Sequence, residues 1–229
     1  MDNKTLKRQI QELEDDILIL ASWVGDATLI AATALKDDNP ETSRSVMERD
    51  SLVNSLRYEI ERSVVAVVAT QRPVDHDLRL LTSILDLCTE LERIGDYAKG
   101  IATIHLRSGG LGMPKVLKDL HYMAQRAVDM LQRAMQAFVM DDVDTARAIV
   151  REDDLIDELY ERIYYEAMDL VVDDPVSLER INYALWVAHN IERVADRTTN
   201  VCERTIFNAT GEISELSVDE VERFTAEVQ

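Results

Sequence analysis

A duplicated segment constrains the fold of this chain more than any other feature of its sequence. Residues 91–96 read LERIGD and residues 191–196 read IERVAD, so the two segments match in chemical class at every position. Upstream of them, residues 49–56 (RDSLVNSL) align with residues 152–159 (EDDLIDEL) at a slightly longer offset. A repeat that spans several segments predicts one structural unit that occurs twice.

Within each copy, apolar residues recur at the spacing of an amphipathic helix. Leu6, Ile10, Leu13 and Ile17 follow one another at steps of three and four, close to the helical period of about 3.6 residues. The chain has only 7 Gly and 4 Pro in 229 residues, which favours long helices because both residues weaken a helix interior. We therefore predict an all-α fold. The expected helices cover about residues 4–36, 41–71, 75–107, 114–140, 142–172 and 175–208.

The boundary between the two copies is predicted at residues 108–114, SGGLGMP, which hold three of the seven glycines. The sequence then divides into a first three-helix repeat (1–108), a second three-helix repeat (114–208) and a tail (209–229). This predicts two tandem, pseudo-symmetric three-helix bundles. In the tail, Ser217 and Glu220 have the spacing of a capping box, which predicts a short C-terminal helix.

The charge of the chain argues against nucleic-acid binding. The net charge is −19, so most of the surface should repel nucleic acids and anionic lipid headgroups. Cys88 and Cys202 lack a Cys-x-x-Cys spacing and are expected to be buried thiols in a reducing compartment. The N-terminus is too charged for a signal peptide, and the apolar runs 17–24 and 64–69 are shorter than the roughly 18 residues of a membrane span. We therefore expect a cytoplasmic protein.

Acidic side chains occur in pairs four residues apart, and such pairs share one helix face. The pairs lie on the middle and last helix of each copy, except that one position holds an amide: Asp50 and Asn54, Glu92 and Asp96, Asp153 and Asp157, Glu192 and Asp196.

Like charges at this spacing destabilise an isolated helix by a few tenths of a kcal/mol, so something should offset them. A hard cation held by several carboxylates is one explanation; such ligands admit Mg, Mn, Fe or Zn. Solvated helix faces, neutralised by Arg93 and Arg193, are the other. Because the pattern recurs in the same register, with Gly95 matched by Ala195, we favour a shared structural or metal role. His189 precedes Glu192 by one turn, but the first copy has Thr89 there, so packing or surface exposure explains this histidine better than ligation.

Motifs of catalysis are absent from the sequence, which has no Gly-rich phosphate loop, Gly-x-Ser-x-Gly or His-Glu-x-x-His. A di-metal carboxylate enzyme is the strongest enzymatic alternative. It requires Glu-x-x-His on two helices, and none of the four histidines has a glutamate three residues before it. We therefore do not expect an enzyme.

The paired motifs resemble those of the PhoU family. Residues 71–79 (QRPVDHDLR) followed by 91–96 resemble the family's most recognisable block, and residues 191–196 with Asn200 resemble its repeat. The resemblance covers about residues 5–208. It implies two pseudo-symmetric three-helix bundles with Glu/Asp-x-x-x-Asp motifs that bind metal ions or multinuclear clusters. By position, the implied metal residues are Asp50, Glu92, Asp96, Asp153, Asp157, Glu192, Asp196 and Asn200.

The resemblance also implies a function. Proteins of this family act with the phosphate-specific ABC transporter and its sensor histidine kinase, and they repress the phosphate-starvation response when phosphate is plentiful. It further implies a homodimer that reaches the membrane only through its partners. In the first copy Asn54 replaces the expected Asp and Gly100 stands opposite Asn200, so we expect the first metal site to be the weaker one. A di-metal enzyme and a metal-free structural adaptor are the alternatives to a regulator.

Overall fold

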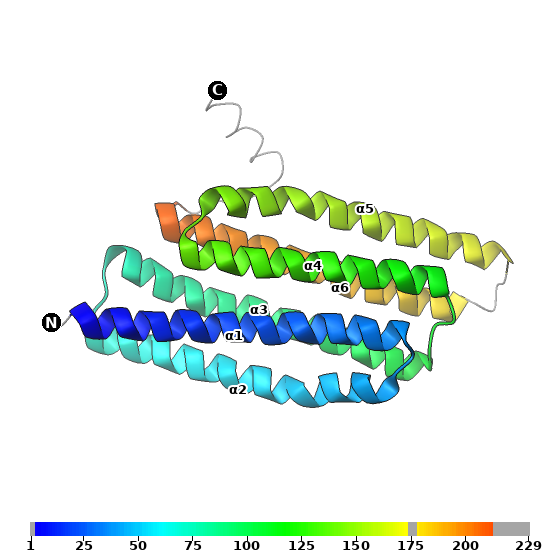
Figure 1. Ribbon diagram of the computed structural model, residues 1–229, viewed down its shortest axis with the longest axis horizontal. Coiled ribbons are helices and arrows are strands. Elements are labelled where there is room, and N and C mark those ends of the chain that lie inside the picture. The colour runs from blue at the N-terminus through cyan, green and yellow to red at the C-terminus, as the bar shows by residue number, and fades with distance from the viewer. Residues whose placement is uncertain (1–2, 174–177, 213–229) are drawn as a thin grey trace, which may run out of the picture.

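Six long helices make up nearly all of the computed structural model, which describes residues 3–173 and 178–212 (Figure 1). The helices are α1 (Asn3–Lys36), α2 (Pro40–Gln71), α3 (Asp75–Ser108), α4 (Pro114–Met140), α5 (Val143–Asp173) and α6 (Leu178–Thr210). The described residues contain no strand, and the all-α prediction is confirmed. The predicted start of the last helix at Pro175 and the predicted helix around Ser217 and Glu220 lie outside the described residues.

Polar side chains begin two of the helices. Asn39 precedes α2 and accepts a hydrogen bond from the backbone amide of Thr42 (3.1 Å), with Pro40 in the first turn. Asp142 precedes α5 and accepts two hydrogen bonds from Thr145, from its amide at 3.0 Å and from its hydroxyl at 2.6 Å. These bonds hold the pKa of the Asp142 carboxyl below its ordinary value. Local capping chemistry thus sets where the middle helix of each repeat starts.

The helices form two bundles that lie side by side. Helices α1, α2 and α3 pack on one another, as do α4, α5 and α6, and this matches the two predicted three-helix repeats. The bundles meet where α3 packs along α6 and α1 packs along α4 (Figure 1). Each repeat therefore presents its first and last helices to the other, while the middle helices α2 and α5 lie on the outside.

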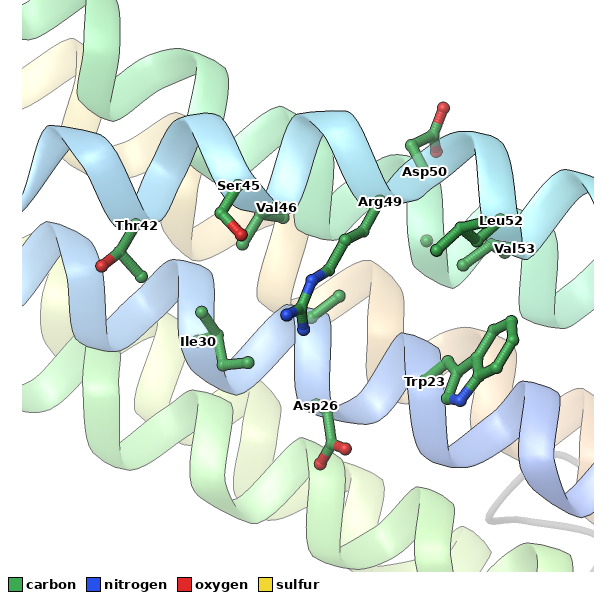
Figure 2. Close-up of a pocket in the computed structure, with 12 residues that line it drawn as sticks. Trp23, Asp26, Ile30, Thr42, Ser45, Val46, Arg49, Asp50, Leu52 and Val53 are labelled. Carbon is green, nitrogen blue, oxygen red and sulfur yellow. The ribbon is translucent and has the colours of Figure 1, made fainter.

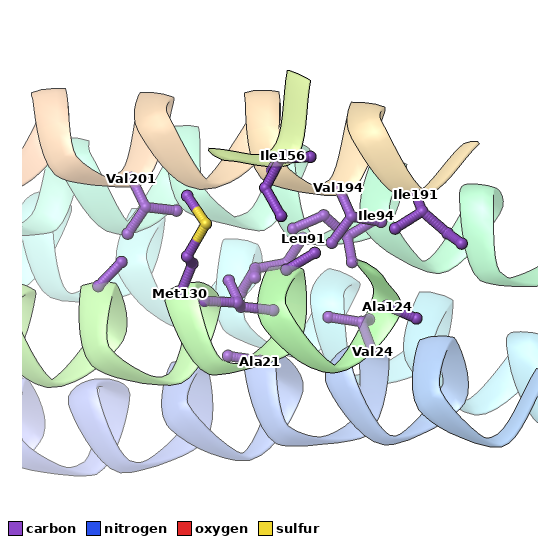
Figure 3. Packing of buried hydrophobic residues seen from close by; sticks show 14 of the residues in the cluster. Ala21, Val24, Leu91, Ile94, Ala124, Met130, Ile156, Ile191, Val194 and Val201 are labelled. Atoms are coloured by element: carbon purple, nitrogen blue, oxygen red, sulfur yellow. The ribbon is translucent and has the colours of Figure 1, made fainter. Parts of the chain in front are cut away.

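A single hydrophobic core runs through both bundles (Figure 3). Leu91 and Ile94 of α3 and Ile191 and Val194 of α6 are fully buried, and these residues belong to the duplicated segments. Burial of each such side chain stabilises the fold by about 1.5–3 kcal/mol. The apolar positions of the duplicated segments therefore belong to the common core, and the acidic positions are partly or fully exposed.

Helix α1 corrects the expectation that no segment reaches the length of a membrane span. Residues 4–36 contain an 18-residue window with a mean hydropathy of 1.7, long and apolar enough to cross a membrane by length and composition. Half of that window is buried within the protein, and α1 packs against α2, α3 and α4. The apolar character of α1 is accounted for by its place between the bundles.

The two cysteines are buried free thiols, as predicted, and burial raises the pKa of both to about 12. Buried histidine chemistry was not predicted. His105 of α3 is 1% exposed; its Nδ1 lies 2.8 Å from Ser43 Oγ and its Nε2 3.1 Å from Asp38 Oδ1. It links the end of α3 to α2 and to the turn before it.

Candidate functional site

The acidic pairs of the second repeat face one another across α5 and α6. Asp153 and Asp157 project from α5, and Glu192 and Asp196 from α6, which packs against it. Burial, followed by the charges of Asp157, Asp196 and Glu192 in that order, raises the pKa of Asp153 to about 7. These charge effects show that the four carboxylates lie near one another. The structure thus brings together the four second-repeat carboxylates that the sequence singled out.

The same repulsion acts on the other members of this acidic cluster. Burial, followed by the charge of Asp196, raises the pKa of Asp157. Burial and Asp196 likewise raise the pKa of Glu192, against the opposing charges of Arg193 and His189. Negative charge is therefore only partly compensated by the cations of the chain itself.

One oxygen of the cluster has no hydrogen bond. Glu192 Oε2 is buried and accepts no hydrogen bond from any residue that the structure describes; His189 Nδ1 lies 3.3 Å and Arg193 Nε 3.5 Å from it. Arg193 is engaged by Asp196, with its Nη1 2.6 Å from Asp196 Oδ2. A buried carboxylate oxygen without a donor is costly, so the second-repeat cluster has the oxygen donors and the unmet charge that suit a hard cation.

The side chains do not enclose an ion as they stand. Among residues 3–173 and 178–212, no three His, Cys, Asp or Glu side chains are grouped closely enough to hold one metal. The carboxylate oxygens of this cluster are suitable ligands for a hard cation. For them to converge on a bound cation, the ion pair between Arg193 and Asp196 has to break. The metal assignment of these residues stays a prediction.

The acidic residues of the first repeat are paired with basic side chains of their own chain. Lys99 Nζ donates to Asp50 Oδ2 at 2.6 Å, and Arg57 Nη1 lies 3.2 Å from Glu92 Oε1. The side chain of Asp50 is only 15% exposed. The hydrogen bond to Asp50 raises the pKa of Lys99, and the charge of Asp96 adds to it. The acidic side chains Asp50, Glu92 and Asp96 thus lie around the ammonium group of Lys99 and the guanidinium group of Arg57.

The second repeat has no counterpart of these two cations. Lys99 aligns with Thr199, and Arg57 aligns with Tyr160. Sequence reasoning missed the role of Lys99 and Arg57, although the alignment of the repeats contained the signal. The expectation of a weaker first site rested on Asn54 and on Gly100 opposite Asn200; the structure adds a further reason, since Lys99 and Arg57 already pair with Asp50 and Glu92.

Asn200 and His189 lie apart from the predicted ligand arrangement. The Asn200 amide donates to Glu90 Oε2 of α3 at 2.9 Å, across the α3–α6 contact between the bundles. His189 is half exposed and touches the cluster only through Glu192. The structure therefore gives Asn200 a contact between the repeats.

Gly95 is a buried position where α3 packs against α1 and α2. A Cβ atom built on it would lie 3.4 Å from Val24 Cγ1 and 3.5 Å from Val53 Cγ1, at ordinary contact distance. The site therefore has room for a small side chain, and Ala195, which is fully buried, occupies the matching place in the second repeat.

Each of the two bundles matches a known protein family. The sequence model of the PhoU domain matches residues 17–104 and again residues 120–205. This chain belongs to the PhoU family. The two matched regions are the two bundles, each from within its first helix to near the end of its third.

Relatives of similar length carry names from phosphate transport. The chain is 29% identical to a phosphate-specific transport system accessory protein PhoU homolog of Clostridium acetobutylicum, over 95% of this chain and 100% of that protein. It is 30% identical to the phosphate-specific transport system accessory protein PhoU of Edwardsiella tarda, over 93% of this chain and 90% of that protein. These are names of accessory proteins, in keeping with the prediction of a non-enzymatic role.

Solved structures agree on the fold. A crystal structure of the phosphate transport system regulatory protein PhoU from Streptococcus pneumoniae superposes with a TM-score of 0.84 at 29% identity, covering 92% of this chain and 100% of that one. PhoU from Pseudomonas aeruginosa also gives 0.84, at 26% identity, covering 90% and 99%. The arrangement of two side-by-side bundles is thus shared with experimentally determined PhoU proteins.

Proposed function

We propose that this chain is a regulatory accessory protein of a phosphate-specific transport system. The observation that carries the proposal is the match of the PhoU domain to both repeats, together with relatives of that name that the chain covers over nearly their full length.

In finer terms, the protein represses the phosphate-starvation response when phosphate is plentiful. It does so at the cytoplasmic side by linking the ABC transporter to a sensor histidine kinase, it works as a homodimer, and it approaches the membrane only through these partners. A net charge of −19 disfavours direct binding to DNA, which supports action through protein partners.

The acidic cluster of the second repeat would hold a divalent or trivalent cation, such as Mg, Mn, Fe or Zn, or a multinuclear cluster. Support comes from the raised pKa of Asp153 and from the Glu192 oxygen that lacks a hydrogen bond. A cation there would compensate the carboxylate charge and tie α5 to α6. We assign it no reaction step, since a binding regulator needs none.

Deletion of the gene tests the regulatory proposal. In phosphate-rich medium, a deletion strain that carries a reporter of phosphate-starvation genes should express it constitutively, and a plasmid copy of the wild-type gene should restore repression. Unchanged phosphate-dependent expression in the deletion strain would sink the proposal. The proposed partners are tested by co-purification: the transporter ATPase subunit and the kinase should be recovered with the tagged protein. If neither is recovered after cross-linking, the protein regulates the response through other partners.

The metal part has a separate readout. Glu192→Ala with Asp196→Ala should remove metal that co-purifies with the wild-type protein. If metal content is unchanged in a folded double variant, the metal assignment fails while the regulatory proposal stands.

A further inference from the structure

A pocket of about 600 Å³ opens between α1 and α2 of the first repeat (Figure 2). Its walls are mainly apolar, with Trp23 and Ile30 contributed by α1 and Val46 and Leu52 by α2; α3 contributes Gly95. Its volume lies within the roughly 300–1,000 Å³ of sites that bury small molecules. The pocket is separate from the second-repeat acidic cluster, which lies between α5 and α6.

One cation stands in this pocket without a partner. Arg49 reaches from α2 toward α1 (Figure 2), and it forms no ion pair with any residue that the structure describes. Asp50 is held by Lys99, and the Asp26 carboxylate points away from the Arg49 guanidinium in the same view. An anionic group of a ligand is the partner that Arg49 is free to accept.

The residues that line the pocket differ in kind from their counterparts in the second repeat. The buried residues Ile17, Leu20 and Val24 of α1 correspond in pattern to Leu120, Met123 and Ala127 of α4, at the offset that aligns the middle helices. On that alignment the first-repeat residues Trp23, Ile30 and Arg49 correspond to Arg126, Arg133 and Glu152.

In the second repeat these three positions are closed by ion pairs. Arg133 Nη1 donates to Glu152 Oε1 at 2.8 Å, and Arg126 Nη2 lies 3.3 Å from Glu152 Oε2. The hydrogen bond from Arg133 lowers the pKa of Glu152. At equivalent places, the second repeat therefore has a network of ion pairs, whereas the first repeat has an apolar pocket beside Arg49. The shared bundle geometry does not by itself produce the pocket, since the side chains at these positions decide whether it is filled.

Apolar surface at the pocket is exposed to solvent. Trp23 is 41% exposed and Leu52 is 55% exposed, and a ligand seated between α1 and α2 would cover both. The lining also holds the acids Asp26 and Asp50, but Asp50 is engaged by Lys99, and the Asp26 carboxylate points away from the Arg49 guanidinium (Figure 2). Aromatic and aliphatic walls with a small number of charged groups are the usual composition of a small-molecule site.

We propose that this pocket binds a small amphiphilic acid. The apolar body of the acid lies between Trp23 and Leu52, and its single carboxylate, sulfonate or phosphate group pairs with Arg49. We infer a free acid with a single anionic group, because the pocket lies between two helices of one bundle and Arg49 is the one basic side chain among the described residues that line it.

Fluorescence of Trp23 tests the proposal. The chain has 2 Trp residues, so in a Trp186→Phe variant Trp23 is the only indole. Titration with dodecanoate, and separately with anilinonaphthalene sulfonate, should change Trp23 emission with one binding site per chain, and dodecanoate should displace the sulfonate. Arg49→Glu should weaken both at least tenfold.

Two further variants make the test sharp. Arg44→Glu makes the same charge change at an exposed α2 position outside the pocket lining, and it should leave affinity within twofold. The triple variant Trp23→Arg, Ile30→Arg and Arg49→Glu places the second-repeat residues in the pocket, and it retains Trp186. Neither dodecanoate nor anilinonaphthalene sulfonate should bind to this variant, and circular dichroism should show that it keeps the helical fold.

Several outcomes would overturn the proposal. One is the absence of any change in Trp23 emission with either acid at millimolar concentration, and another is an affinity of Arg49→Glu for the acids equal to that of the parent protein. A third is a change in Trp23 emission that depends on protein concentration alone, which would assign the pocket to a contact between copies of the chain. Sedimentation with phosphatidylglycerol vesicles in the absence of dodecanoate binding would assign it to a membrane surface instead.

Discussion

Lys99 Nζ lies 2.6 Å from Asp50 Oδ2, whereas the equivalent acid of the second repeat, Asp153, faces a position where Thr199 replaces the lysine. The first repeat therefore supplies its own counterion, and the second repeat leaves its carboxylates to repel one another. This difference separates the two halves of a fold that is otherwise duplicated.

We predict that metal binding is confined to the second repeat. Asp153→Asn with Asp157→Asn should abolish Mn²⁺ binding measured by equilibrium dialysis and elemental analysis, because hard cations need carboxylate charge. Asp50→Asn with Glu92→Gln is the matched control and should leave the bound metal unchanged. Equal losses in both double variants would contradict the inequality of the sites.

The counterions of the first repeat can be exchanged for the residues of the second. Asn54→Asp with Arg57→Tyr and Lys99→Thr should add a metal equivalent per chain in the same dialysis assay. Without metal, this variant should lose about 1–2 kcal/mol of unfolding free energy, since the half-buried Asp50 loses its partner. A variant that stays as stable as wild type in EDTA, with no added metal binding, would show that Lys99 and Arg57 do not act as counterions.

Asp153 should make the metal-free protein less stable as pH rises. Its folded-state pKa of about 7 lies above the ordinary value of 3.8 for an aspartate, so the protonated form is favoured by folding. The stabilisation is fully present below pH 4 and is lost as pH rises through 7. After allowance for partial solvent contact, we expect a loss of about 2 kcal/mol across this window.

Urea unfolding in EDTA at pH 5 and pH 8 measures this effect. Asp153→Asn should flatten the pH dependence, whereas Glu158→Gln, an exposed acid on the same helix, should not. An unchanged slope in Asp153→Asn would mean that the carboxylate titrates near its usual pKa.

His105 should contribute to stability as a buried polar link. His105→Ala leaves a cavity and removes the hydrogen-bonding partner of Ser43 and Asp38, so we expect a loss of about 2–4 kcal/mol in the free energy of unfolding. His189→Ala is the control; this half-exposed histidine should change stability by less than about 0.5 kcal/mol. Chemical denaturation of both variants decides the matter, and similar losses would argue against a structural role for His105.

The helices were predictable because their signals are local. Apolar residues at steps of three and four, with scarce Gly and Pro, predicted six helices whose ends lie within a few residues of those observed where the structure describes them. Asn39 and Pro40 show why: a capping side chain and a proline act within one turn of their own position. The acidic pairs were likewise predictable, because residues four apart share a helix face in any helix.

The contacts between helices were not predictable in the same way. The ion pair of Lys99 with Asp50 joins residues 49 positions apart, and the contact of Asn200 with Glu90 joins residues 110 positions apart. Alignment of the repeats would have exposed Lys99 opposite Thr199, but the partner of the ammonium depends on how α3 packs on α2.

The sequence by itself determined the helices, their duplication and the acidic faces, since each follows from spacing along one chain segment. Only the tertiary structure decided that the two bundles share one core through α3 and α6, that the first acidic face is neutralised by Lys99 and Arg57, and that a pocket opens beside Arg49 in the first repeat. The physical reason is that charge compensation and cavity formation depend on distances between helices, which periodicity within a helix does not contain.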